Sequence, residues 1–256
     1  MSSVIVGSEL PLTERYASDA VQVFDADERA RFLDEAGVAR HHGQLAWELL
    51  YRIEPSLYVR LVAGERLHEG ILGWLPERCE RILEVGAGAG RLTLELARRS
   101  AHLTAVEPAA PLRQILAERL HEAGAGHARA VRGFFDDLPV PAHSHDLVIS
   151  CAAFTRDGLV DPDRCLAEME SRCARGGMVV LVWPSEVAWL DSHGFDHIAF
   201  AGPMTVEYQS VEEAMLLARI FYPDALASIV RGGSRFVDYA TLGLNAPRDV
   251  CWKRCR

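Results

Sequence analysis

The feature that most restricts the fold of this chain is an alternation of short apolar runs and helical segments that starts at Arg81. Apolar runs of strand length recur as "RILEV" (81–85), "HLTAVE" (102–107), "ARAVRG" (128–133), "HDLVISC" (145–151) and "GMVVLVW" (177–183). Segments with helical periodicity stand between most of them, at 91–100, 111–124 and 161–174. This alternation is typical of a parallel sheet covered by helices on both faces.

The rest of the chain extends this pattern in both directions. After Trp183 come a helix, a glycine turn and a sixth strand, then a helical stretch over 210–231 and a last strand, "DVCWKR" (249–254). Before the first strand, helical patterns cover 25–37, 41–55 and 55–65. The sequence therefore predicts a helical cap or lid over 1–70 and a doubly wound α/β core over 71–256, with a helical insertion at about 203–247.

Charge and composition exclude several classes of protein. Acidic residues outnumber basic ones by 36 to 27, which argues against broad electrostatic capture of nucleic acid. No apolar run has the length of a membrane span, and the opening segment lacks the pattern of a signal peptide, so we expect a cytoplasmic protein without membrane contact. The six cysteines form no CxxC pair, which predicts reduced thiols and no metal site.

A glycine turn follows the first strong strand, in the stretch "EVGAGAG". Gly86, Gly88 and Gly90 let a ligand approach the backbone, and the helix that begins next offers free N–H groups. A dinucleotide site needs Gly or Ala three residues after Gly88, where this chain has Arg91. Glu84, just before the turn, would repel a pyrophosphate but would suit an ammonium or sulfonium group.

A second acidic residue, Glu107, ends the next strand, 23 residues after Glu84. A carboxylate at this position can accept hydrogen bonds from both hydroxyls of a ribose. The sequence therefore predicts a ligand that contains a ribose and no diphosphate.

Five motifs in order resemble those of the class I S-adenosylmethionine-dependent methyltransferases. They are "ILEVGAGAGRLT", "AVEP", "GFFDDLPVP", "HDLVISCAAF" and "DPDRCLAEMESRCARGGMVVLV", and the match is continuous from about Gly70 to Trp183 and weaker beyond. The resemblance implies a Rossmann-like seven-stranded sheet with an antiparallel last strand. It also implies S-adenosyl-L-methionine as cofactor and S-adenosyl-L-homocysteine as product.

The resemblance also assigns cofactor-binding residues. Around the methionine part it places Glu84 and the backbone of Gly86, Ala87 and Gly88, with Gly90 allowing close packing at the helix start. The residues that it places around the adenosine are Glu107, Pro108, Phe135, Asp136, Cys151 and Ala152. Many relatives have Asp directly after the glycine of the adenine-binding turn, whereas Phe134 follows Gly133 here. The adenine acceptor is then Asp136 or Asp137, or adenine is held by apolar packing.

Methyl transfer from an activated sulfonium is an in-line displacement that depends on alignment, and it needs a base only when the acceptor must lose a proton. Candidate residues for the acceptor site are His41, His42, Tyr51, Tyr58, His68 and Arg156. Each also has a simpler interpretation, since Tyr51 and Trp47 can form one buried helix stripe and His41 and His42 can be exposed at a helix start.

We therefore expect a methyltransferase that acts on oxygen, nitrogen or carbon of a small, apolar or aromatic metabolite. Two alternatives stay open: a non-catalytic methyltransferase-like subunit, and an enzyme of this fold that uses the cofactor for a rearrangement or cyclisation. The expected partner is a small-molecule acceptor, and the sequence leaves a homodimer open.

Overall fold

The computed structural model describes residues 9–156, 159 and 161–256, apart from the side chain of His42. The chain divides into two compact units. One, here called the helical unit, comprises Met1–Arg66 and Gly202–Ala246; the other, the sheet unit, comprises Leu67–Ala201 and Pro247–Arg256. The segments that the sequence analysis treats as a cap and an insertion thus belong to one unit.

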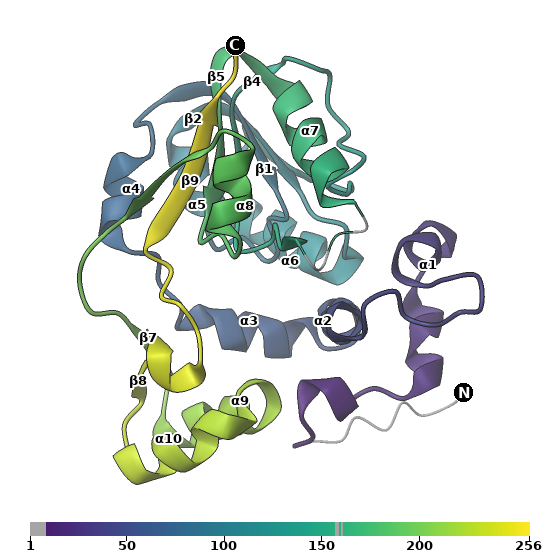
Figure 1. The fold of residues 1–256 in the computed structure, drawn as a ribbon, viewed down its shortest axis with the longest axis vertical. Coiled ribbons are helices and arrows are strands. Elements are labelled where there is room, and N and C mark those ends of the chain that lie inside the picture. Colours follow the sequence, from purple (N-terminus) through teal and green to yellow (C-terminus); the bar gives the residue numbers. More distant parts are fainter. Residues whose placement is uncertain (1–8, 157–158, 160) are drawn as a thin grey trace. The chain divides into compact units, whose positions relative to one another are not determined.

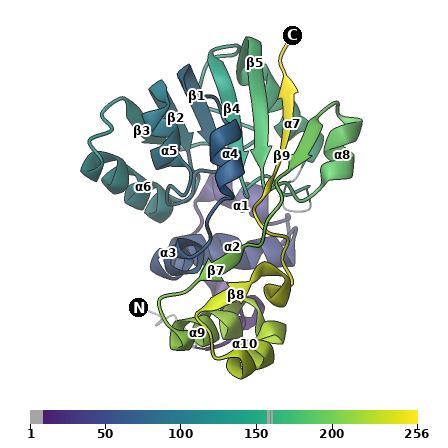
Figure 2. The ribbon, with the colours of Figure 1, turned by 90° about the vertical axis from the view of Figure 1, so that its left-hand side faces the viewer.

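A seven-stranded sheet forms the centre of the sheet unit, in the order β3-β2-β1-β4-β5-β9-β6 (Figure 2). Its strands are β1 (Cys79–Val85), β2 (Ser100–Val106), β3 (Ala128–Val131), β4 (His145–Cys151), β5 (Cys173–Val182), β6 (Asp196–Ala199) and β9 (Asp249–Arg254). The pairs among β1 to β5 are parallel, and β9 runs antiparallel to both of its neighbours. This confirms the predicted doubly wound sheet with an antiparallel last strand.

Helices cover both faces of this sheet. On the face of Ile82, the packed helices are α4 (Glu69–Trp74), α5 (Thr93–Arg98) and α6 (Ala110–Glu122). On the face of Leu83, they are α7 (Pro162–Arg172) and α8 (Val187–Ser192). Ile82 and Leu83 are both fully buried, as expected for a strand that packs on two sides. No helix lies between β3 and β4, where residues 132–144 form the connection.

The helical unit contains the remaining elements. Its α-helices are α1 (Ala26–Phe32), α2 (His42–Ile53), α3 (Pro55–Ala63), α9 (Val211–Phe221) and α10 (Leu226–Gly232). Its 3₁₀ helices are Leu12–Glu14, Ser18–Val23, Pro223–Ala225 and Tyr239–Leu242. Two strands, β7 (Thr205–Glu207) and β8 (Phe236–Asp238), form a small antiparallel sheet close to α9 and α10 (Figure 1).

Local sequence explains where these helices begin. Asp25 caps α1 in a capping box, in which its side chain accepts the N–H of Glu28 and Glu28 accepts the N–H of Asp25. The hydroxyl of Ser210 accepts the N–H of Glu213 at the start of α9. The core of the unit then joins distant parts of the chain, because Leu50 of α2 packs in one cluster with Ile220 of α9.

A buried group of charges lies within the helical unit. The guanidinium of Arg52 pairs with Glu28 at 2.8 Å and with Glu48 at 2.6 Å. It also lies over the rings of Phe24 and Phe32, 5.1 and 5.3 Å from their centroids. Burial raises the pKa of Glu48, and the charge of Arg52 opposes this rise. Arg52 therefore compensates two buried carboxyl groups at once.

Over the described residues, we find no helix that combines the length and the apolar character needed to cross a membrane.

Candidate functional site

The glycine turn follows directly on β1. Gly86, Gly88 and Gly90 have φ angles of +73°, +56° and +96°, a region that strongly favours glycine. The N–H groups of Gly86 and Ala87 both donate to the carbonyl of Val106, at 2.9 and 3.0 Å. These bonds tie the turn to the end of β2 and fix its path.

Glycine at position 86 is also required by space. A Cβ added to Gly86 would lie 2.4 Å from the Cβ of Ala153 and 3.4 Å from the ring of Phe135. The turn after β1, the residues after β4 and the turn after β3 therefore meet at Gly86. They pack so closely there that a side chain at position 86 would overlap Ala153.

Glu107 lies beside the glycine turn, immediately after β2, and only 5% of its surface is exposed. One of its oxygens, Oε2, accepts the N–H of Gly88 at 2.9 Å, and Oε1 accepts the N–H of Ala109 at 2.8 Å. Both oxygens therefore hold backbone N–H groups, one in the glycine turn and one just after β2. Its orientation is fixed before a ligand binds.

Glu84, at the end of β1, is 2% exposed. Its Oε2 has no hydrogen-bond partner among the described residues. Burial raises the pKa of Glu84 to about 8, and the charge of Glu107 adds to the rise, while the hydroxyl of Thr93 opposes it. A buried carboxyl group of this kind is suited to a positively charged ligand group, which would supply the missing partner.

The predicted adenine-binding turn is a tight reversal of the chain. Phe134 and Asp137 exchange backbone hydrogen bonds of 3.2 and 3.1 Å, so that Phe135 and Asp136 occupy the tip. The ring of Phe135 contacts the ring of Phe154 edge-on, with 5.4 Å between centroids. Asp136 is half-buried and Asp137 exposed, which makes Asp136 the better placed of the two acceptor candidates.

The other assigned residues also lie at the carboxyl ends of strands. Cys151 ends β4 and is half-buried, and Ala152 follows it with a φ of +56° and an N–H that donates to Val182. Pro108 follows Glu107, and its carbonyl accepts a hydrogen bond from Arg113 at 2.9 Å.

Two arginines of α6 support the site and were not predicted. Arg113 donates to the carbonyl of Glu107 at 2.8 Å as well as to that of Pro108. Arg119 donates to the carbonyl of Ala89, inside the glycine turn, at 2.6 Å. Their places on α6, six and twelve residues after Glu107, are a weak signal, since helical arginines are usually exposed.

Four of the candidate acceptor-site residues belong to the helical unit. His41 is exposed and precedes α2 without capping it, and the side chain of His42 lies outside the described residues. Tyr51 and Tyr58 are half-buried and make an edge-on contact, with 4.9 Å between ring centroids. Trp47 stacks on Phe221 of α9, with 5.5 Å between ring centroids. This contact agrees with the simpler interpretation, in which the aromatic residues of α2 form a packing stripe.

The other two candidates belong to the sheet unit. His68 caps α4, where its Nδ1 accepts the N–H of Gly70 at 3.0 Å and its Nε2 lies 3.2 Å from the carbonyl of Ala201. Its ring also stacks on Phe200. Arg156 is exposed, and its carbonyl accepts the N–H of Leu159. The contacts of His68 are thus those of a helix-capping residue.

The sheet order and the helices on both faces define a Rossmann-like α/β domain, with the glycine turn and two buried carboxyl groups at the carboxyl ends of β1 and β2. Residues 82–177, which run from β1 into β5, match the family described as methyltransferase domain. This stretch of the chain is therefore similar to methyltransferase domains, a class whose cofactor is S-adenosylmethionine.

Curated relatives match part of the chain. An uncharacterized methyltransferase of Geobacillus kaustophilus is 32% identical over 114 residues, which cover 44% of this chain and 50% of the relative. An uncharacterized methyltransferase of Mycobacterium tuberculosis is 31% identical over 115 residues, or 45% of this chain and 44% of the relative. The chain spans about half the length of these relatives, so the similarity concerns the domain.

Solved structures share the fold at low sequence identity. The [4+2]-cyclase SpnF has a TM-score of 0.56 at 16% identity, over 83% of this chain and 96% of its own. The YcgJ protein from Bacillus subtilis has a TM-score of 0.52 at 16% identity, over 74% of this chain and 100% of its own. Proteins with this fold thus include one that is named as a cyclase.

Proposed function

We propose that this protein transfers a methyl group from S-adenosylmethionine to oxygen, nitrogen or carbon of a small, apolar or aromatic metabolite. The observation that carries the proposal is the buried Oε2 of Glu84, which has no partner among the described residues and lies at the end of β1, next to the glycine turn. The ammonium group of the cofactor's methionine part would be its partner.

The residues of the sheet unit fit this cofactor. Gly86 has no side chain that would screen the backbone of the turn, and Glu107, whose carboxylate is fixed beside the turn, is the candidate partner of the ribose hydroxyls. Phe135 and the half-buried Asp136 would hold the adenine by apolar contact and by an acceptor oxygen. Bound there, the cofactor would supply a methyl group on a positively charged sulfur.

The proposed role of the chain in the reaction is to position the reactants and exclude water. If rigid turns hold the methionine part and the ribose of the cofactor, an acceptor needs only to be aligned with the cofactor's methyl group. A general base is required only for acceptors that must lose a proton.

A second candidate function follows from the likeness to the cyclase SpnF. A fold does not determine the reaction, and an enzyme of this fold can use a bound cofactor without transferring its methyl group. Formation of S-adenosylhomocysteine separates the two functions, because only methyl transfer produces it.

The first experiment is calorimetric titration of the full chain with S-adenosylmethionine and with S-adenosylhomocysteine. We expect saturable binding of both and at least about tenfold weaker binding by Glu84→Gln, since an uncharged amide replaces the partner of the ammonium group. Glu122→Gln, at the exposed end of α6, is the matched control and should bind like the unmodified chain. Equal affinities for Glu84→Gln and the control would overturn the cofactor assignment.

The second experiment incubates the chain with S-adenosylmethionine and a panel of phenols, amines, thiols and carbon acids, and follows S-adenosylhomocysteine and methylated product by mass spectrometry. We expect the two products to form in equal amounts with at least one apolar acceptor. Cofactor binding without S-adenosylhomocysteine formation across the panel would refute methyl transfer and favour the cyclase-like or non-catalytic alternatives.

A further inference from the structure

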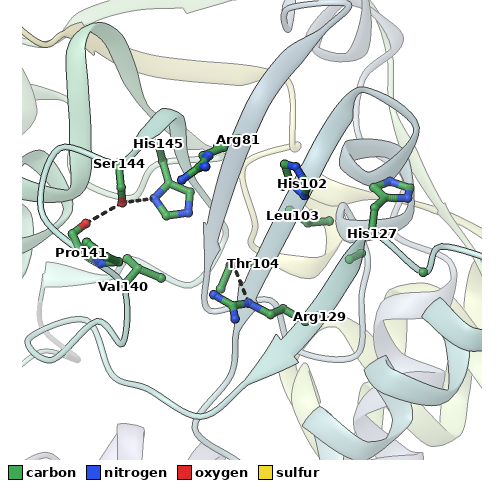
Figure 3. A pocket seen from close by; sticks show the side chains of 12 residues that line it. Arg81, His102, Leu103, Thr104, His127, Arg129, Val140, Pro141, Ser144 and His145 are labelled. Atoms are coloured by element: carbon green, nitrogen blue, oxygen red, sulfur yellow. Dashed lines mark hydrogen bonds between the residues drawn. The ribbon is translucent and has the colours of Figure 1, made fainter.

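A cavity lies at the amino-terminal ends of β1 to β4, at the edge of the sheet opposite the glycine turn. Its volume is about 470 Å³, within the range of small-molecule sites. Its lining includes Arg81, Arg129, Val140, Pro141, Ser144 and His145 (Figure 3). Arg81 lies three residues before Glu84 on β1, towards the amino-terminal end of the strand, so the cavity is separate from the candidate cofactor site.

The topology of the sheet explains why polar side chains gather there. Arg81 pairs with His102 and Thr104 pairs with Arg129 across parallel strands, so each pair shares one face of the sheet. This is the face of Leu83, because Arg81 and Leu83 are two residues apart on β1. The connection from β3 to β4 has no helix to cover this face, and the cavity lies between the strands and the segment Val140–His145.

Two guanidinium groups in this cavity make no ion pair with any described residue. Arg129 donates from Nε to the hydroxyl of Thr104 at 3.3 Å, which leaves both of its terminal nitrogens available. The side chain of Arg81 makes no hydrogen bond within the part of the chain that the structure describes, and it lies beside His145 (Figure 3). Several other arginines of the chain are paired with carboxylates, among them Arg99 with Glu95 and Arg172 with Glu168.

The acidic groups near the cavity do not neutralise these arginines directly. Asp146 accepts the backbone N–H of Arg81 at 2.8 Å, and Glu80 lies 4.0 Å from Nε2 of His102. Neither carboxylate forms an ion pair with Arg81 or Arg129. In a chain of net charge −9, two unpaired arginines in one cavity form a local positive site.

Ser144 and His145 form one wall of the cavity, and burial together with the charge of the two arginines lowers the pKa of His145. The hydroxyl of Ser144 donates its hydrogen to the carbonyl of Pro141 at 2.6 Å. Because that hydrogen is used, Nδ1 of His145 donates to the hydroxyl oxygen of Ser144, 2.9 Å away. Burial lowers the pKa of His145 to about 4, and the charges of Arg81 and Arg129 contribute while Asp146 opposes the shift. The positive charges of Arg81 and Arg129 therefore act on His145 at the cavity wall.

We propose that this cavity binds a small molecule that carries a phosphate monoester. Guanidinium groups match the geometry of phosphate oxygens and bind them with paired, charge-assisted hydrogen bonds. Arg81 and Arg129 would hold the phosphate, and Val140 and Pro141 offer apolar contact to the organic part. The site is independent of the proposed methyl transfer, since it involves none of the cofactor residues.

The test uses phenyl phosphate as the probe in a phosphate-free buffer at constant ionic strength, with binding followed by calorimetry. We expect saturable binding with one site per chain, and about tenfold or greater weakening in Arg81→Gln and in Arg129→Gln. Arg231→Gln, exposed on α10 in the helical unit, is the matched control and should leave the affinity unchanged. Each variant is also titrated with S-adenosylhomocysteine, which we expect to bind as it does to the unmodified chain.

A second measurement avoids any dependence on variant folding. Phenylglyoxal modifies accessible arginines of the unmodified chain, and peptide mass spectrometry reports the rate at each one. We expect phenyl phosphate to slow modification of Arg81 and Arg129 at least severalfold and to leave Arg231 unaffected. Benzoate, which replaces the phosphate by a carboxylate on the same ring, should protect much less.

Several outcomes would overturn the proposal. They are the absence of saturable phenyl phosphate binding, equal affinities in Arg129→Gln and Arg231→Gln, and equal protection by benzoate and phenyl phosphate. Tighter binding of a short single-stranded oligonucleotide, lost in the same two variants, would refute a small-molecule site. None of these results depends on whether the cofactor binds.

Discussion

The carboxylate of Glu107 accepts the backbone N–H of Gly88 at 2.9 Å and thereby joins the end of β2 to the glycine turn after β1. A second bond from Ala109 leaves the side chain with both oxygens engaged and little freedom to rotate. The acidic residue is thus part of the turn's own structure as well as a candidate ligand to a ribose.

Replacing Glu107 by alanine should therefore weaken the fold and the cofactor site together. The change leaves two N–H groups without an acceptor, which costs about 1–3 kcal/mol each when they are buried. We expect a fall of roughly 2–4 kcal/mol in the free energy of unfolding, measured by urea denaturation, and a clear loss of S-adenosylhomocysteine affinity. Glu118→Ala, exposed on α6, is the control, and the same denaturation midpoint for both variants would contradict the structural role.

Gly86→Ala tests the close packing around Gly86, the first residue after β1. The residue has a φ of +73°, and the new Cβ would lie 2.4 Å from that of Ala153. Gly124→Ala is a matched control, because Gly124 has a φ of +65° and no atom within 4 Å of an added Cβ.

Backbone strain alone should cost about 1–2 kcal/mol in both glycine variants. The overlap at Gly86 should add about 1–3 kcal/mol, seen as a lower melting temperature of Gly86→Ala than of Gly124→Ala. Cofactor affinity should fall only in Gly86→Ala. Similar melting temperatures and affinities in the two variants would show that the glycine turn can adjust to hold the alanine side chain at position 86.

The raised pKa of Glu84, about 8, predicts that cofactor binding is coupled to proton release. An ammonium group pairs with the ionised carboxylate, whereas the free site is mostly protonated at pH 7. Calorimetry at pH 7 in buffers of different ionisation enthalpy should report the release of about one proton per cofactor bound. Affinity should also rise between pH 5.5 and 7.5, and Glu84→Gln should remove both effects.

The same group has a second effect on the protein without cofactor. A carboxyl group whose pKa is higher in the folded state than in the unfolded state contributes stability at low pH, and this contribution is lost as pH rises through the folded-state value. The free energy of unfolding should therefore decline between about pH 4.5 and 8. In Glu84→Gln this part of the decline should disappear, and an unchanged pH profile would argue that Glu84 is not buried as described.

The buried charges of the helical unit predict a large effect at Arg52. Arg52→Met keeps apolar contact with Phe24 and Phe32 but leaves Glu28 and Glu48 without their cation. We expect a loss of about 3–5 kcal/mol in the free energy of unfolding. Adding Glu28→Gln and Glu48→Gln should recover part of the loss, and the exposed Arg40→Met should have little effect.

Much of the sheet unit could be predicted because its signals are local. The segment "DVCWKR" was predicted as the last strand and forms β9 (Asp249–Arg254). Glu84 and Glu107 were placed at strand ends from the apolar runs that precede them, and the structure has them at the ends of β1 and β2. Buried parallel strands have long apolar runs, which a sequence displays directly.

Other features depend on contacts between distant residues and left no local pattern. The strands β7 and β8 have three residues each and pair across 28 intervening residues, too short a pattern to recognise. The use of Arg119 to hold the carbonyl of Ala89 depends on the packing of α6 against the glycine turn. His68 was considered as an acceptor-site residue, whereas its cap on α4 depends on the backbone angle there.

The way in which the helical unit is divided along the chain has a consequence for how the protein folds during synthesis. Leu12 and Leu50 belong to the same core cluster as Ile220, so this cluster is completed only after some 170 further residues follow α2. Residues 67–201, in contrast, provide six of the seven strands of the sheet in one continuous stretch. Since segments that emerge together can fold first, most of the sheet can assemble while the apolar side of α2 still awaits its partner. In this interval the nascent chain exposes an apolar helix face, the kind of surface that chaperones bind.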